Sequence, residues 1–175
     1  MPLTTFRATP RAPRRAAGYA LLEALIAVIV TSVGFIGAAR LQTLGMSFGN
    51  TAGLRQKATL LVDQMTDRIR ANQAGMTLGA YNRPTAGDTA CLTAAAGCTP
   101  AQLARADMAE WSADIAAQLP GGSGIVCIDA TPEDAAIGSA ADPNCDGSGR
   151  VLAVKVWWTD KFGPHRFTTA TRPAR

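Results

Sequence analysis

The chain has 175 residues and a formal net charge of +4, from 17 Lys and Arg against 13 Asp and Glu. The whole excess lies before residue 19, in Arg7, Arg11, Arg14 and Arg15, so the rest of the chain carries equal numbers of both signs. The pI of about 9.2 therefore belongs to the N-terminal segment, and we expect no nucleic-acid partner. The length allows one domain and a membrane segment.

Residues 19–39 form an apolar run of 21 residues in which Glu23 is the sole charge. As a helix it would be about 30 Å long, the thickness of a bilayer core. The 16 residues after Glu23, up to Ala39, are slightly short of a full span. The arginines before the run predict a cytoplasmic N-terminus and an exported remainder.

The junction before this run reads RRAAG at residues 14–18 and YALLE at residues 19–23. It resembles the class III leader of type IV prepilins, although that family usually has Phe where this chain has Tyr19. The resemblance implies that a prepilin peptidase cleaves between Gly18 and Tyr19 and that Tyr19 is then N-methylated. It also implies that Glu23, the fifth mature residue, is needed for assembly.

Glu23 would lie about one helical turn from the ammonium that cleavage creates at Tyr19. In a bundle of such helices its carboxylate can pair with the terminal amine of a neighbour, which fixes register more than it adds stability. Two alternatives remain open. One is a secretory signal peptide cut after the small residues 37–39, and the other is a plain signal anchor in which the carboxylate is incidental.

The helix is predicted to continue to Gln73, with Gly75 as its C-terminal cap. Its second half is amphipathic, and its apolar positions are Leu54, Ala58, Leu61, Met65 and Ile69. Glycines punctuate the helix, and they either let it bend or unwind or allow close contact between helices; they are Gly34, Gly37, Gly45, Gly49 and Gly53. We divide the chain into a leader (1–18), a transmembrane and assembly helix (19–40), its amphipathic continuation (41–74) and a globular head (75–175).

The head is predicted to begin with a loop over residues 76–99. A second helix follows, with Thr99 as N-cap, Pro100 at its first position and Gln102 completing a capping box. Three strands are predicted at 125–129, 151–158 and 166–171, the last two joined by a turn over 160–164. The fold class is therefore α+β, with a long helix packed on a small antiparallel sheet. We expect Trp157 and Trp158 to point to opposite faces of that sheet, one into the core and the other toward a neighbouring subunit.

Four cysteines follow the apolar run, on the side expected to be oxidising: Cys91, Cys98, Cys127 and Cys145. Three connectivities are possible, and we favour Cys91–Cys98 and Cys127–Cys145 because they join neighbours in the sequence. The spacings lack a C-x-x-C pattern and the chain has one histidine, so we expect no zinc site.

Two other candidate sites are weak. Asp142, Asn144 and Asp146 match the start of a calcium loop, but the twelfth place is Ala153 instead of a bidentate Glu. We therefore expect a solvated turn with Asx geometry there. His165 lies in the predicted hairpin without a credible nucleophile beside it, so general-base chemistry is not expected.

The order of the predicted elements, with DMAEW at 107–111, LPGGSG at 119–124 and VKVWW at 154–158, is similar to the type IV pilus modification protein (PilV) family of minor pilins. The resemblance implies a pilin-like fold, no enzymatic activity, no cofactor, and a place among minor pilins that prime a pilus near its tip. The implied partners are the prepilin peptidase, other minor pilins, the major pilin and the inner membrane. The implied location is a single-pass inner-membrane precursor that later joins the surface filament. The alternatives are a minor pseudopilin of a type II secretion system and a signal-anchored periplasmic binding domain.

Overall fold

The computed structural model of the protein describes residues 19–87, 89–133 and 137–172. The expected leader, residues 1–18 with the cleavage residue Gly18, lies outside the described residues. The chain divides into two compact units between Ser47 and Phe48. We call residues 19–47 the N-terminal unit and residues 48–172 the head unit.

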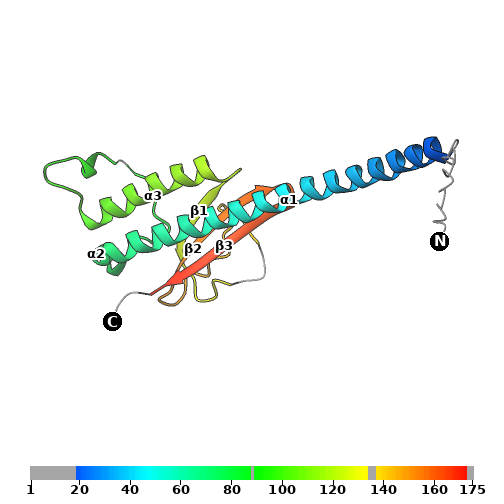
Figure 1. Ribbon diagram of the computed structural model, residues 1–175. Coiled ribbons are helices and arrows are strands. Elements are labelled where there is room, and N and C mark those ends of the chain that lie inside the picture. Colours follow the sequence, from blue (N-terminus) through cyan, green and yellow to red (C-terminus); the bar gives the residue numbers. More distant parts are fainter. Residues whose placement is uncertain (1–18, 88, 134–136, 173–175) are drawn as a thin grey trace, which may run out of the picture. The chain divides into compact units, whose positions relative to one another are not determined.

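Helix α1 spans Tyr19–Ala71 and is the first element of the chain (Figure 1). It ends two residues earlier than predicted because Asn72 starts a new turn of helix, α2 (Gln73–Thr77). The backbone N–H of Gly75 donates to Asn72 Oδ1 at 3.0 Å. Gly75 therefore lies inside α2 and is not the C-terminal cap of the long helix, which corrects the prediction.

The helix α3 spans Pro100–Gln118 and begins as predicted. The Thr99 side chain accepts from the backbone N–H of Gln102, and Gln102 Oε1 accepts from the backbone N–H of Thr99 at 2.9 Å. This capping box satisfies two of the orphan donors at the start of the helix. The predicted loop before it is only partly irregular, since it includes the last two residues of α2 and the short 3-10 helix η1 (Ala90–Leu92).

Three antiparallel strands form one sheet in the order β1-β2-β3: Ser123–Ile128, Leu152–Asp160 and Gly163–Thr171. The register pairs Val126 with Val154, and Val156 with Phe167. The β2–β3 turn is tighter than predicted: only Lys161 and Phe162 separate the strands, and Pro164 pairs with Thr159. The α+β fold, a long helix with a small antiparallel sheet and a further helix, is confirmed.

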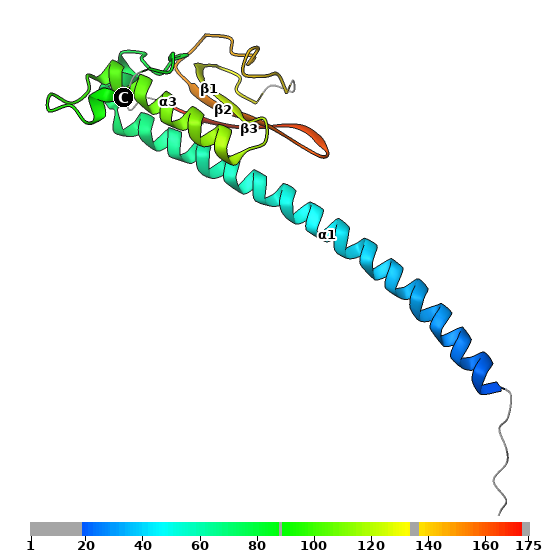
Figure 2. The same cartoon turned by 90° about the horizontal axis from the view of Figure 1, so that it is seen from above.

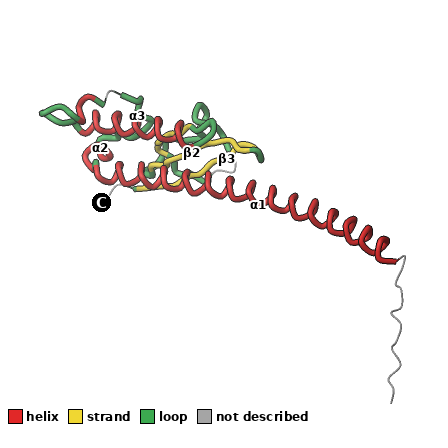
Figure 3. Tube along the Cα trace, turned by 45° about the horizontal axis from the view of Figure 1, so that its top comes forward, coloured by secondary structure: helices red, strands yellow, loops and turns green. Residues whose placement is uncertain are grey.

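Within the head unit, α3 runs alongside the C-terminal part of α1, and the sheet packs next to both (Figures 2 and 3). All predicted apolar positions of the amphipathic half of α1 are buried, and the core joins them to Trp111, Ile115, Val154, Val156 and Trp158. Trp111 is fully buried, and its Nε1 donates to the carbonyl of Leu61 at 2.8 Å. A Cβ on Gly124 would lie 2.6 Å from the Trp111 ring, so this glycine lets α3 approach β1 closely.

Both faces of β2 are covered, which the alternating pattern did not predict. One face points into the helical core, and the connection from β1 to β2 lies over the other. Trp157 Nε1 donates to the carbonyl of Ile137 in that connection at 2.7 Å. Trp157 and Trp158 are 5% and 2% exposed, so the expectation that one of them is available to a neighbouring subunit is wrong.

Candidate functional site

The N-terminal unit presents a helix that the described part of its own chain does not cover. Every residue from 19 to 46 is exposed. This stretch makes α1 long and apolar enough to cross a membrane. Its large apolar side chains include Leu22, Ile29 and Phe35, which are 57%, 54% and 74% exposed. The structure is therefore consistent with the predicted transmembrane helix. The orientation, with a cytoplasmic N-terminus and an exported head, stays a prediction.

Polar groups inside this apolar stretch fall into two kinds. The hydroxyl of Ser32 donates to the carbonyl of Ile29 at 2.7 Å, and that of Thr31 donates to the carbonyl of Ala27. Such bonds satisfy the hydroxyls inside the helix and make them tolerable in lipid. Glu23 differs, because it has no hydrogen-bond or ion-pair partner within the described part of the chain. A carboxylate in this position is costly in a membrane and calls for a partner from elsewhere.

Glu23 lies four residues after Tyr19, the first residue of α1. At 3.6 residues per turn, positions four apart share one face of a helix. The side chain of Tyr19 is 83% exposed. The structure thus places the two residues on one exposed helix face, while Gly18, the predicted cleavage residue, lies outside the described residues.

The five glycines of α1 are not required by contacts within the chain. A Cβ on Gly34, Gly37, Gly45, Gly49 or Gly53 would meet nothing within 4 Å. α1 is helical through all five positions. The two explanations offered by the sequence, bending during assembly and close approach of another helix, both remain predictions.

The head unit is closed by two disulfides. Cys91 pairs with Cys98, and Cys127 with Cys145, which confirms the favoured connectivity. The first closes a small loop that ends at the capping box of α3. The second ties β1 to the connection that covers the outer face of the sheet.

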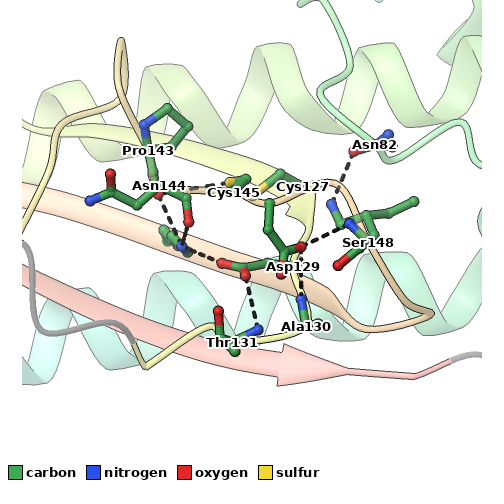
Figure 4. Close-up of a disulfide and its surroundings, with 12 residues drawn as sticks. Asn82, Cys127, Asp129, Ala130, Thr131, Pro143, Asn144, Cys145 and Ser148 are labelled. Atoms are coloured by element: carbon green, nitrogen blue, oxygen red, sulfur yellow. Dashed lines mark hydrogen bonds and ion pairs between the residues drawn. A yellow bond between two sulfur atoms is a disulfide. The ribbon is translucent and has the colours of Figure 1, made fainter.

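Beside the second disulfide lies a buried ion pair that sequence reasoning missed (Figure 4). Lys155 Nζ lies 2.5 Å from Asp129 Oδ2, and both side chains are 0% exposed. The ammonium also donates to the carbonyls of Pro143 and Asn144 at 2.9 and 3.1 Å. These three acceptors match the three donors of a lysine ammonium, so the charge is fully satisfied without water.

The carbonyls that hold Lys155 come from the two residues immediately before Cys145. The Cys127–Cys145 disulfide therefore fixes the loop that supplies two of the three acceptors. Cys127, Asp129 and Cys145 have ligand atoms within 4.8 Å of one another. The two sulfurs are bonded to each other and the carboxylate is bonded to Lys155, so the function of this cluster is structural.

The weak calcium candidate forms a turn instead. Asp146 Oδ1 accepts from the backbone N–H groups of Ser148, at 2.8 Å, and Ala130, at 3.1 Å. These bonds hold the pKa of Asp146 below its ordinary value. The Ser148 bond is an Asx turn, as predicted. Asn144 adopts a φ of 51°, and its carbonyl faces Lys155, while Asp142 closes a turn with Ser139.

A second polar cluster joins α1, α3 and the segment after α2. Arg68 Nη1 lies 2.6 Å from Glu110 Oε2 and 3.3 Å from Asp107 Oδ1. The hydroxyl of the fully buried Tyr81 donates to Asp107 Oδ2. Burial and this carboxylate raise the pKa of Tyr81. The cluster joins the last turn of α1 to the middle of α3, and both carboxylates have partners.

The β2–β3 turn presents an aromatic and basic surface. The rings of Phe48 and Phe162 stack with their centroids 5.7 Å apart, and Lys161 Nζ lies 4.8 Å from the centroid of Phe162. These two rings, with Thr51, Ala52, Arg55 and His165, line a shallow hollow of about 370 Å³. His165 Nε2 lies 2.9 Å from Asp160 Oδ1, so this histidine is engaged within the turn.

Comparisons with protein-family models, with curated proteins and with solved structures found no match. Inference about function therefore depends on the chain's own residues.

Proposed function

We propose that the protein is a minor pilin that takes part in the assembly of a type IV pilus, as a subunit in or near the tip. The observation that carries the proposal is the exposed apolar stretch of α1 with one carboxylate, Glu23, that has no partner among the described residues and lies one turn from Tyr19. A chain that folded only for its own head would not expose so much apolar surface. The prepilin-like junction before Tyr19 supports the same reading.

The proposed role of the stretch has two stages. In the precursor, residues 19–39 hold the chain in the inner membrane with the head exported. After cleavage at Gly18, the ammonium of Tyr19 and the carboxylate of Glu23 meet their counterparts on neighbouring helices. Each pair removes two unpaired charges from an apolar environment, so a subunit in the wrong register leaves both charges unpaired.

The proposed role of the head is to present a fixed surface to neighbouring subunits. Two disulfides and a buried ion pair stabilise it without a catalytic arrangement among the described residues. The one histidine is paired with Asp160, and the four cysteines are oxidised. We therefore propose a binding and assembly role without enzymatic activity.

The first test is the N-terminal mass of the mature protein in its host. The proposal predicts a chain that starts at N-methylated Tyr19. A start near Arg40 would indicate a secretory signal peptide, and an intact N-terminus would indicate a signal-anchored domain; either result contradicts the proposal. A pseudopilin of a type II secretion system would give the same mass, so the filament must also be identified.

The second test is incorporation into sheared pili, measured by immunoblotting with Glu23→Gln. We expect Glu23→Gln to remain in the membrane and to be lost from the filament fraction. The matched control is Asp63→Asn, which also converts an exposed carboxylate of α1 to an amide. Equal incorporation of both variants would refute the role of Glu23, and incorporation into secretion pseudopili alone would favour the alternative system.

A further inference from the structure

The surface at the β2–β3 turn is not explained by the fold. We call Phe48, Arg55, Lys161 and Phe162 the tip patch. The positive φ of this hairpin falls on Gly163, at 122°, and neither of the two residues between the strands has a positive φ. Here the turn is Lys161-Phe162, with Phe162 55% exposed. The backbone of the turn does not require an aromatic side chain at position 162, so the exposed ring needs another explanation.

The chemistry of the tip patch is aromatic and positively charged. Phe48 is 60% exposed, and its ring stacks on Phe162. Arg55 and Lys161 are exposed beside the rings. The acid of the turn, Asp160, has a side chain that is only 3% exposed and is paired with His165. Aromatic rings with Lys and Arg are the composition of membrane interfaces, where rings sit among headgroups and cations meet anionic lipid.

The length of α1 is consistent with this partner. Phe48 is the 30th residue of the helix. At about 1.5 Å per residue the helix advances about 44 Å from Tyr19 to Phe48, which matches the roughly 40–45 Å of a bilayer with its headgroups. Between Glu23 and Arg55 the only charge is Arg40, and the helix stays apolar beyond it, with Leu41, Leu44 and Met46 exposed.

We propose that the tip patch docks onto the anionic headgroup layer of the membrane that anchors the chain, before the subunit enters a filament. The patch is small, with four side chains against the 20–30 residues of a stable protein interface. A small patch suffices for lipid because the membrane-anchored helix α1 tethers the patch. The effective concentration of headgroups at the patch is therefore high, and weak contacts are enough for docking. The proposal depends on membrane anchoring and not on the pilin assignment.

The test places a fluorescent reporter at the turn of the full chain. Phe162→Trp is reconstituted into nanodiscs of zwitterionic lipid, and of zwitterionic lipid mixed with phosphatidylglycerol, each with brominated acyl chains as quencher. The control is Leu92→Trp, an exposed residue near the Cys91–Cys98 disulfide. That loop lies at the opposite end of the head unit from the β2–β3 turn (Figures 1 and 2). Trp111, Trp157 and Trp158 are buried and contribute the same background to both variants.

We expect the Trp emission of Phe162→Trp to lose more intensity than that of Leu92→Trp, with the greater loss in anionic nanodiscs. Adding Lys161→Gln to the Phe162→Trp chain should reduce the loss in the anionic lipid. Equal loss from the two reporters overturns the proposal. The proposal is also overturned if the Trp at position 162 is protected from quenching by aqueous acrylamide but is not quenched by brominated lipid. Such a result would mean that protein, and not lipid, covers the patch.

Discussion

Residues 19–46 of α1 are exposed without exception, whereas the same helix beyond Phe48 buries a residue every three or four positions. Both stretches are helical and carry large apolar side chains, and they differ in what covers those side chains. Leu54, Leu61 and Ile69 are covered by the chain's own sheet and second helix. Cover for Leu22, Ile29 and Phe35 must come from lipid or from other chains. The two halves of one helix therefore have separate sources of stability.

The polar groups follow the same division. In the head unit, Lys155, Asp129, Arg68 and Asp107 have partners within the chain. In the N-terminal unit, Glu23 has none among the described residues. The proposed association with neighbouring helices would give this carboxylate the partner that the described residues do not supply.

The largest expected effect tests this separation directly. Trp111→Ala removes a fully buried ring that packs on β1 and bonds the carbonyl of Leu61. We expect the free energy of unfolding of the head unit to fall by about 3–5 kcal/mol. Phe35→Ala should change it by less than about 0.5 kcal/mol, because Phe35 is 74% exposed and is not one of the buried core residues. Urea unfolding of the full chain in detergent micelles, followed by circular dichroism, measures both. A comparable loss in Phe35→Ala would mean that the two units are coupled.

The buried ion pair provides the next test. Lys155→Met leaves the carboxylate of Asp129 buried without its partner, and we expect a loss of about 3 kcal/mol in the free energy of unfolding. Adding Asp129→Leu to that chain should recover part of the loss, because the uncompensated charge is removed. The same urea experiment shows this, and a double variant less stable than the single one would contradict the argument. Arg40→Met removes a cation from the N-terminal unit and should leave the head unchanged.

Several features of the head were predictable because each depends on residues close in the sequence. The stripe from Leu54 to Ile69, the capping box at Thr99 and the pairing of neighbouring cysteines are local patterns. Glu23 and Tyr19 also stand out as a local spacing, although no partner for Glu23 lies among the described residues. The end of α1 was missed by two residues because the side chain of Asn72 caps a new turn.

Burial of Lys155 could not be predicted from local patterns. Alternation along β2 assigns Lys155 and Trp157 to one face, and a two-layer fold leaves such a face in water. The connection from β1 to β2 covers it instead, and this stretch is rich in Ala, Gly and Asp without periodicity. The available signal was Lys155 itself, which stands within the apolar run VLAVKVWW, with Asp129 directly after the neighbouring strand.

The two disulfides should differ in their contribution. The Cys127–Cys145 link joins residues 18 apart and the Cys91–Cys98 link residues 7 apart. Loop-closure entropy alone gives about 3 and about 2 kcal/mol. The difference should exceed that estimate, because the longer loop also supplies the carbonyls that hold Lys155. We expect Cys127→Ser/Cys145→Ser to lower the urea midpoint more than Cys91→Ser/Cys98→Ser. Adding Lys155→Met/Asp129→Leu to each disulfide variant should reduce the difference between their urea midpoints. An unchanged difference would mean that the Cys127–Cys145 disulfide does not act through the ion pair.

The smallest expected effect concerns the β2–β3 turn, where the ring of Phe162 stacks on that of Phe48. Burial opposes the charge of Asp160, but hydrogen bonds from His165, from the N–H of Phe162 and from Thr51 outweigh it and lower the pKa of Asp160 from 3.8. A carboxylate with a lowered pKa in the fold contributes stability above its unfolded pKa and loses it as the pH falls through the folded value. Wild type should therefore lose slightly more stability than Asp160→Asn between about pH 5 and pH 2. Urea midpoints across that range measure the difference, and Asp63→Asn, which alters an exposed carboxylate of α1, should track wild type. If Asp160→Asn also tracked wild type, the hydrogen bonds at the turn would not stabilise the charged form of the Asp160 carboxylate.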